Sequence, residues 1–420
     1  MQSSIKLRLT VMNFLQFAVW GAYLTSMGRY LGTAGFGSEI GNFYAMQGLV
    51  SLFMPALMGI VADRWIPAQR LLGLCHMIAG MLMLGVFLYT QTEAPSYTTL
   101  FALYSLSVAF YMPTLALSNS VAYTSLDQAG LDLVKSFPPI RVFGTIGFIC
   151  TMIGVSLVGV EATSGQFAVS AIIGLVLAVY SQTLPNCPTA PKGQSKSLVE
   201  ALGLRAFVLF KQRKMALFFI FSMLLGVSLQ ITNGFANPFI STFGEIPAYA
   251  DTFGVKHANI LISLSQLSET LCILLIPFAL RRFGIRRVML IAMTAWVLRF
   301  ALLGLGDPGS GVWLFLLSMI VYGVAFDFFN VSGSLFVDKE TDPSIRSSAQ
   351  GLFMIMTNGI GATLGSLGAQ AVINYFVNSE TDTTAILDGW SMSWYVFAAY
   401  AAVVTVLFAL LFRYKTETEA

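Results

Sequence analysis

Four ionisable side chains lie inside stretches of the chain that are otherwise apolar, namely Arg141, Glu269, Arg299 and Asp327. A charge near the centre of a lipid bilayer costs at least ~3 kcal/mol, so such a group usually serves a transport pathway, a proton relay or a charge pair. Glu269 is the first candidate for proton coupling, because a carboxyl group held inside the membrane can take up and release a proton. A permanently ionised structural partner of Arg141, or a carboxylate that only holds the bound solute, are the alternative roles for this side chain.

Arg299 and Asp327 lie at matching depths in two consecutive apolar stretches, about 15–16 Å from the same end at the rise per residue of an α-helix. A neutralising structural pair between the two stretches is therefore the favoured interpretation. A second proton-coupling site at Asp327 is the alternative.

Other polar and aromatic side chains are spaced so that they share helix faces. The groups are Arg141 with Thr145 and Phe148, Gln230 with Asn233, Gln266 with Glu269, and Tyr322 with Phe326. Amides can both donate to and accept from sugar hydroxyls, and a planar base can stack on an aromatic ring for about 1–3 kcal/mol. The set therefore suits a small neutral solute with a hydroxylated part and a flat aromatic part, such as a nucleoside. Hydrogen bonds between membrane helices and ordinary ring packing are the plainer alternatives.

The amino-acid composition indicates whether these residues lie in water or in lipid. Of the 420 residues, 56% are hydrophobic and only 10% are charged, whereas a soluble domain carries about 25% charged residues. The sequence therefore predicts an all-α protein that crosses the lipid bilayer many times. The net charge of +3 does not indicate a nucleic-acid partner, because the basic residues follow the membrane topology.

The basic residues are distributed unevenly between the two sides of the membrane. All but four of the 23 Lys and Arg residues fall in segments assigned to one side; Arg29 and Lys256 fall on the other, and Arg141 and Arg299 lie within spans. Such an excess marks the cytoplasmic side, so both termini are expected to be cytoplasmic.

Twelve apolar runs are long enough to cross ~30 Å of hydrocarbon as helices. They span residues 9–30, 41–62, 71–91, 98–123, 137–158, 166–184, 215–240, 257–280, 288–305, 312–337, 349–375 and 391–412. A polar, basic connection divides the chain into a six-helix bundle at 1–184, a cytoplasmic linker at 185–214 and a second six-helix bundle at 215–420. Two such bundles predict alternating access to a solute bound near the membrane midplane between them.

The sequence offers no signature of catalysis or metal binding. No polar segment is long enough for a catalytic domain, and no G-x-x-x-x-G-K-[ST] phosphate-binding loop is present. The four cysteines and two histidines lack metal-ligand spacing. We therefore expect a carrier driven by an ion gradient, not an enzyme, with no cofactor.

The stretch Gly59-Ile-Val-Ala-Asp63-Arg64 resembles the G-x-x-x-D-R loop of the major facilitator superfamily. In that superfamily the loop joins the second and third helices and helps to lock one state of the transport cycle. The resemblance implies a gating role for Gly59, Asp63 and Arg64. The corresponding segment Pro277–Arg282 lacks the Gly and the Asp, so no gating role is expected there. A basic cytoplasmic turn is the alternative for the first copy.

Longer motifs resemble the bacterial nucleoside/proton symporter family of that superfamily. They are Phe137–Phe148, Ser222–Gly226, Leu229–Asn233 and Val321–Asn330, and Asn13–Phe17 and Met54–Leu57 also fit. The resemblance covers nearly the whole chain. It implies uptake of purine or pyrimidine nucleosides together with a proton, by a multi-pass protein of the bacterial inner membrane that we expect to be monomeric.

The same resemblance implies which residues contact the substrate. The family's residue type is present at nine positions: Arg141, Thr145, Phe148, Gln230, Asn233, Gln266, Glu269, Tyr322 and Phe326. Gly234 and Ala236, next to the candidates of the seventh run, depart from the family and could retune substrate choice. A proton-coupled carrier for another hydroxylated solute, such as a sugar, is the alternative function.

Overall fold

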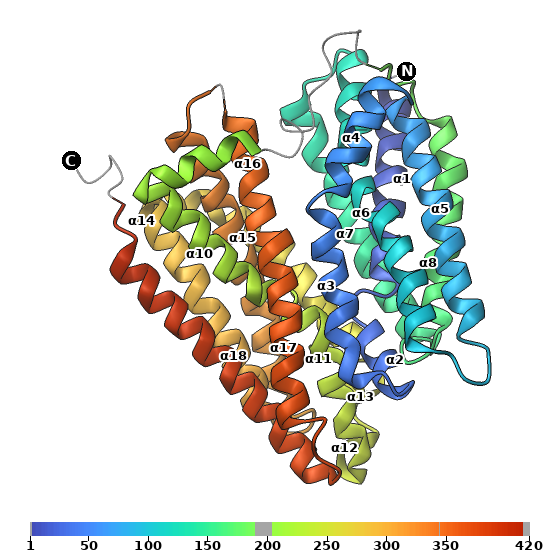
Figure 1. The fold of residues 1–420 in the computed structure, drawn as a ribbon, viewed down its shortest axis with the longest axis vertical. Helices are drawn as coiled ribbons and strands as arrows, with labels where there is room; N and C mark the ends of the chain where they lie inside the picture. The colour runs from blue at the N-terminus through green and yellow to red at the C-terminus, as the bar shows by residue number, and fades with distance from the viewer. Residues whose placement is uncertain (1, 190–203, 344, 415–420) are drawn as a thin grey trace. The chain divides into compact units, whose positions relative to one another are not determined.

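The computed structural model describes residues 2–189, 204–343 and 345–414, and these residues are mostly helical (Figure 1). The chain forms two compact units, one made of residues 1–30 and 49–202 and the other of residues 31–48 and 203–420. Most of the predicted cytoplasmic linker, at residues 190–203, lies outside the described residues.

The first unit is built from the helices of the first half of the chain. Its elements are α1 (Gln2–Gly21), the start of α2 (Met27–Thr33), the end of α3 (Ile40–Ser51), α4 (Met54–Arg64), α5 (Ala68–Tyr89), α6 (Tyr97–Gln128), α7 (Leu133–Leu157), α8 (Gly165–Tyr180) and the 3₁₀ helix η2 (Ser181–Thr183). Helix α1 packs mainly on α7 and also on α8 and α6, while α5 packs on α6 and α8. Leu72, Val121 and Leu177, from α5, α6 and α8, belong to the buried apolar core of this unit.

The second unit contains the helices of the second half of the chain. Its elements are η3 (Leu204–Lys211), α10 (Arg213–Leu229), α11 (Ile231–Thr242), η4 (Phe243–Glu245), α12 (Pro247–Ala250), α13 (Phe253–Lys256), α14 (Ala258–Leu305), α15 (Val312–Glu340), α16 (Arg346–Met354), the π-helix η5 (Ile355–Gly361), α17 (Ala362–Phe376) and α18 (Thr383–Leu411). Helix α14 packs on α15 and α18, and α10 packs on η5 and α17.

Residues 31–48 come from the first half of the chain but pack within the second unit. The segment includes the 3₁₀ helix η1 (Gly37–Glu39). The side-chain amide of Gln370 on α17 donates to the carbonyl of Gly37 at 3.0 Å and accepts from the backbone N–H of Gly41 at 2.5 Å. Asn374, one turn further along α17, donates to the carbonyl of Ser38 at 3.3 Å. Side-chain amides therefore hold this segment against α17.

All twelve apolar runs of the sequence coincide with helices. Ten helical stretches of the described residues are long and apolar enough to cross a membrane. One of these stretches, α14, contains two of the predicted runs. A break in the helix at Gly284, where φ is 74°, separates them. Glycine reaches this conformation without the steric cost that a Cβ would add. Helices α1 and α2 cover the remaining run.

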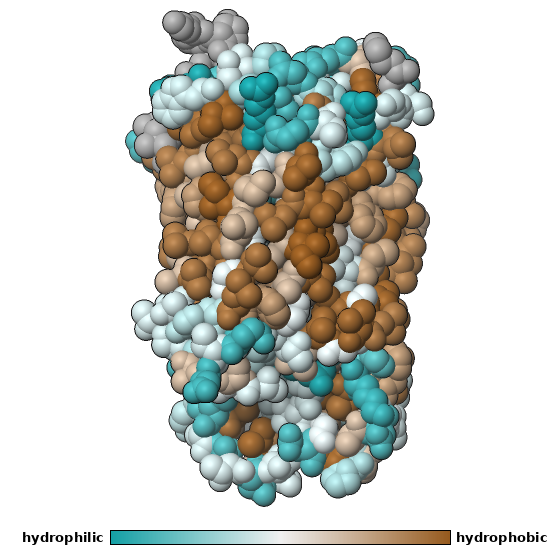
Figure 2. Space-filling view, turned by 90° about the vertical axis from the view of Figure 1, so that its right-hand side faces the viewer, coloured by the Kyte–Doolittle hydropathy of each residue, from teal (hydrophilic) through white to brown (hydrophobic). Residues whose placement is uncertain are grey.

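The outward surface fits a lipid environment. Figure 2 shows a broad band of apolar residues on one face of the molecule, with hydrophilic residues at both ends of the band. On α5 and α8 the exposed apolar side chains include Met81, Leu88, Ile172, Val176 and Val179. Such a surface would be unfavourable in water but is the expected one against hydrocarbon. The predicted multi-pass, all-α membrane fold is therefore confirmed.

Glycines allow close contact between α10 and the helix formed by η5 and α17. A Cβ atom added at Gly361 would meet the carbonyl of Met223, and one added at Gly365 would meet the carbonyl of Val227. Gly368, almost one turn beyond Gly365, has open space around it. The packing of membrane helices on one another depends on such small residues at the contact.

We expect Gly365→Ala to lower the stability of the purified protein in detergent, measured by its thermal unfolding midpoint. The added methyl group would overpack a backbone contact, which typically costs about 1–3 kcal/mol. Gly368→Ala is the matched control on the same helix and should leave the midpoint unchanged or raise it, because alanine favours helix over glycine. Equal midpoints for the two variants would contradict this account of the α10–α17 contact.

Candidate functional site

In the first unit, two of the three candidate residues on α7, Arg141 and Phe148, lie beside aromatic side chains of α1. The guanidinium carbon of Arg141 is 4.1 Å from the ring centroid of Phe17. The ring of Phe148 packs edge-on against Trp20, with the ring centroids 6.4 Å apart, and Phe148 is buried. Thr145, between Arg141 and Phe148 along the chain, is half-buried. The three residues thus follow one line along α7, as their spacing predicts.

Two glycines bring α1 and α7 together at this point. A Cβ at Gly147 would collide with the backbone of Phe14, and one at Gly21 would collide with the backbone of Phe148. The helices therefore approach each other at backbone contact, which sets Phe17 and Trp20 of α1 against the candidate residues of α7. The aromatic wall beside Phe148 depends on these glycines.

In the second unit, the helix that carries two candidate amides is interrupted at Gln230. Helix α10 ends at Leu229 and α11 begins at Ile231. Asn233 Nδ2 donates to Gln230 Oε1 at 2.8 Å, and Gln230 is 7% exposed. This bond leaves Gln230 Nε2 and Asn233 Oδ1 available, so the pair can still donate one hydrogen bond and accept another.

A cation and two rings are stacked between α14 and α15. The rings of Tyr322 and Phe326 lie nearly parallel, 5.6 Å between centroids with 10° between their planes. The guanidinium carbon of Arg299 is 4.5 Å from the centroid of Tyr322, and Trp296 packs edge-on against the same ring. The spacing of Tyr322 and Phe326 predicted a shared helix face, and the ring contact confirms it. The stack offers a flat apolar surface one helical turn long.

Arg299 is almost completely buried, at 2% exposure, and its hydrogen-bond partners lie on both α14 and α15. Its Nη1 donates to the carbonyl of Ser318 at 2.7 Å and lies 3.4 Å from Ser265 Oγ. Ser318 Oγ donates back to the carbonyl of Arg299 at 3.0 Å. Arg299 therefore braces the two helices through backbone carbonyl, hydroxyl and ring contacts.

The structure does not join Arg299 to Asp327, the partner expected from matching depth. Ser318 and Tyr322 are four residues apart on α15 and share the face turned toward Arg299. Asp327 is five residues beyond Tyr322, about 140° further around the helix, which turns it away from the guanidinium. The direction of the Asp327 side chain around α15 therefore does not favour the expected pair.

Asp327 instead lies within electrostatic reach of Glu269, a second carboxyl group. Asp327 is 5% exposed, and its Oδ2 has no hydrogen-bond partner among the described residues. Glu269 is half-buried on α14, and Gln266, one turn earlier on that helix, is half-buried too. Both carboxyl groups thus remain candidates for carrying the transported proton.

The three residues of the superfamily-like loop lie near the end of α4 in the first unit. Gly59 has open space at the position of a Cβ, Asp63 is half-buried, and Arg64 is exposed. Their position at a helix end fits a cytoplasmic turn as well as a gating loop, so the gating role stays a prediction.

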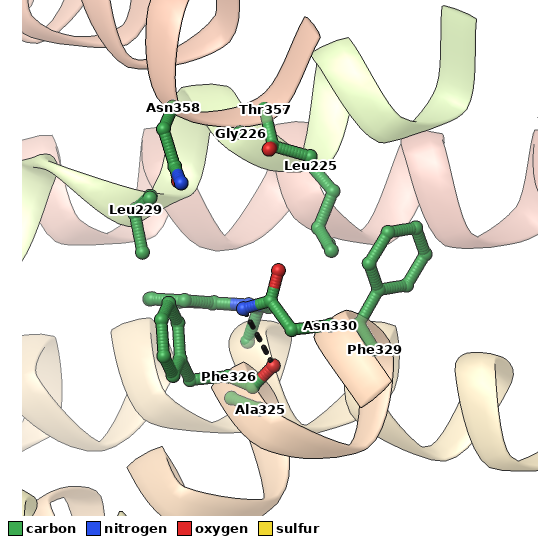
Figure 3. Close-up of a pocket in the computed structure, with 10 residues that line it drawn as sticks. Leu225, Gly226, Leu229, Ala325, Phe326, Phe329, Asn330, Thr357 and Asn358 are labelled. Carbon is green, nitrogen blue, oxygen red and sulfur yellow. Dashed lines mark hydrogen bonds between the residues drawn. The ribbon is translucent and has the colours of Figure 1, made fainter. Parts of the chain in front are cut away.

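A pocket in the second unit contains residues that the sequence reasoning did not select. Its lining comes from α10, α14, α15 and η5: Leu225, Gly226, Leu229, Trp296, Ala325, Phe326, Phe329, Asn330, Thr357 and Asn358 (Figure 3). Asn330 follows Phe326 by one helical turn, and that spacing was a usable signal. Asn358 lies on the π-helix η5, and no sequence pattern predicted that distortion.

Comparison with known proteins places the chain among transporters. A family model described as nucleoside H+ symporter matches residues 3–417. The xanthosine permease of Escherichia coli is 48% identical over 420 residues, covering 99% of this chain and 98% of the relative. The nucleoside permease NupG of Escherichia coli is 47% identical over 416 residues, covering 98% of this chain and 97% of the relative.

Solved structures give the same assignment. A crystal structure of the nucleoside transporter NupG superimposes with a TM-score of 0.89 at 45% identity, covering 98% of this chain and all of that one. A POT family transporter, PepTSo, has a TM-score of 0.70 at 14% identity, with 98% of this chain and 97% of that chain covered, which shows a shared fold. The family resemblance seen in the motifs is thereby confirmed: the chain belongs to the nucleoside H+ symporter family.

Proposed function

We propose that this protein is a proton-coupled nucleoside importer of a bacterial inner membrane, working by alternating access. The observation that carries the proposal is the family match along almost the entire chain, residues 3–417. Both curated relatives described above are named as permeases for nucleosides or for xanthosine. Transport rather than catalysis is therefore the activity of the group to which this chain belongs.

The chemistry of the candidate site supports a nucleoside as the solute. The stacked rings of Tyr322 and Phe326 present a flat surface on which a base can stack, and the bonded amides of Gln230 and Asn233 can pair with ribose hydroxyls. The proposed substrate contacts are Arg141, Thr145, Phe148, Gln230, Asn233, Gln266, Glu269, Tyr322 and Phe326. Most of these groups are uncharged, which suits a neutral solute better than a phosphate ester.

Proton coupling is assigned to the carboxyl groups of Glu269 and Asp327. The guanidinium of Arg299 contacts the carbonyl of Ser318 and the ring of Tyr322. An ion pair with Asp327 would require Arg299 to break both of these contacts. A proton held by either carboxyl group removes one negative charge from the apolar interior. Glu269 is also a proposed substrate contact, so the same side chain takes part in binding the solute and in binding the proton.

The remaining features of the cycle are also proposals. The excess of basic residues on one side favours cytoplasmic termini. A locking role for Gly59, Asp63 and Arg64 follows from the superfamily-like loop. We propose that the protein functions as a monomer, because each proposed contact comes from this one chain.

Cells that lack their own nucleoside carriers and express this protein should accumulate labelled uridine, adenosine or xanthosine. A protonophore should abolish the accumulation, because the gradient supplies the driving force. Excess unlabelled nucleoside should compete with the label, whereas sugars should not. Competition by sugars with none by nucleosides would favour the alternative carrier for hydroxylated solutes and overturn the nucleoside assignment.

Replacement of Glu269 by Gln should abolish accumulation driven by a pH gradient in proteoliposomes, because the amide has nearly the same shape but cannot carry the proton. Asp327→Asn tests the second carboxyl group in the same assay. Glu245→Gln removes an exposed carboxylate from η4 and serves as the matched control. If Glu269→Gln still concentrates the nucleoside as the control does, Glu269 is not the coupling residue.

A further inference from the structure

The pocket shown in Figure 3 is small and has mostly apolar walls. Its volume is about 20 Å³, which is room for one water molecule or one substituent of similar size. Leu225 and Leu229 of α10, Trp296 of α14, and Phe326 and Phe329 of α15 supply apolar side chains. A polar group that enters such a space needs hydrogen-bond partners there, because burying it without them is costly.

Two asparagine side chains supply those partners. Asn330 Nδ2 donates to the carbonyl of Phe326 at 3.2 Å, which fixes the orientation of the amide. The opposite atom, Asn330 Oδ1, is directed into the pocket in Figure 3 and makes no hydrogen bond to the described residues. Asn330 therefore presents an unused acceptor.

Asn358 reaches the pocket from another wall. Its only recorded hydrogen bond within the described part of the chain is a weak one from Nδ2 to the sulfur of Met354, at 3.7 Å. Figure 3 shows the end of this side chain directed toward the pocket from η5, while Asn330 extends from α15. Its oxygen, like that of Asn330, is free to accept a hydrogen bond.

The backbone that carries Asn358 is distorted in a way that often accompanies function. Residues Ile355–Gly361 form a π-helix between α16 and α17. Such turns are rare in proteins as a whole, but those that occur are often found at functional sites. Thr357, next to Asn358, bonds its hydroxyl to the carbonyl of Phe353 at 2.9 Å. The hydroxyl is thus used locally, and the amide remains for a ligand.

The pocket adjoins the groups proposed to bind the solute. Phe326 lines the pocket and at the same time stacks on Tyr322. Leu229 lines it and directly precedes Gln230. A flat base held against the ring stack would therefore have its edge, and any substituent on that edge, beside the two asparagines.

We propose that this pocket is a subsite for an exocyclic amino group of the nucleobase, with Asn330 Oδ1 and Asn358 Oδ1 as hydrogen-bond acceptors. The inference rests on the proposed nucleoside function. An amino group donates two hydrogen bonds, one to each oxygen, whereas an oxo group in the same place would face two acceptors and leave them unpaired. The subsite therefore selects amino over oxo nucleosides.

The test compares nucleosides that differ at one exocyclic group, cytidine with uridine and adenosine with inosine, by counterflow in proteoliposomes. The unmodified protein should prefer the amino member of each pair. Asn330→Leu should raise the half-saturation concentration for cytidine and adenosine by about fivefold to tenfold, the effect of losing one buried hydrogen bond. Uridine and inosine should change by about twofold or less, since they make no such bond.

Asn358→Leu removes the second acceptor from the other wall and should show the same selectivity, which protects the test against a folding defect in one variant. Thr294→Val is the control: Thr294 is exposed on α14, and its hydroxyl donates to the carbonyl of Leu290, one turn back. An equal change for amino and oxo members, or none, would overturn the subsite and indicate a structural water pocket. Absence of any nucleoside counterflow by the unmodified protein would instead contradict the proposed function.

Discussion

The burial of Arg299 is the constraint around which the second unit is organised. A guanidinium at 2% exposure is tolerable in an apolar interior only when its charge and donors are matched. The carbonyl of Ser318 and the ring of Tyr322, both on α15, provide part of that match, while Arg299 Nε has no hydrogen-bond partner among the described residues. Arg299 is therefore one of the side chains that hold α14 against α15, and its ring contact helps to orient Tyr322. Since Phe326 stacks on Tyr322, the surface proposed for the base is fixed by the same residue.

The contacts of Arg299 also bear on the two carboxyl groups proposed for proton coupling, those of Glu269 and Asp327. Arg299 makes its contacts to Ser318 and Tyr322 of α15, and among the described residues Asp327 lies within electrostatic reach of Glu269. We propose that one of these two carboxyl groups carries the transported proton. A solute that contacts Glu269 would alter how readily that proton is held, which gives a physical link between binding and protonation. The link needs no long pathway, because both events involve one pair of side chains.

Hydropathy was sufficient to predict the spans, since each of the twelve apolar runs must be a helix to satisfy its backbone in lipid. The spacing of residues along one helix was sufficient to predict which side chains contact each other there, as the Gln230–Asn233 bond and the Tyr322–Phe326 stack show. Contacts between side chains on different helices were harder to predict. Depth along the membrane is readable from the sequence, but the rotation of each helix is not, so Arg299 was assigned to Asp327 instead of Ser318. The π-helix that carries Asn358 and the placement of residues 31–48 in the second unit depend on tertiary packing that no local pattern encodes.

The central claim is that nucleoside and proton move together. The most direct measurement places the purified protein in liposomes containing a pH-sensitive dye, with potassium and valinomycin holding the membrane potential at zero. Addition of nucleoside outside, with no imposed pH gradient, should acidify the interior, because each solute molecule that enters brings a proton with it. Entry of labelled nucleoside at the same rate with no change in internal pH would contradict the account.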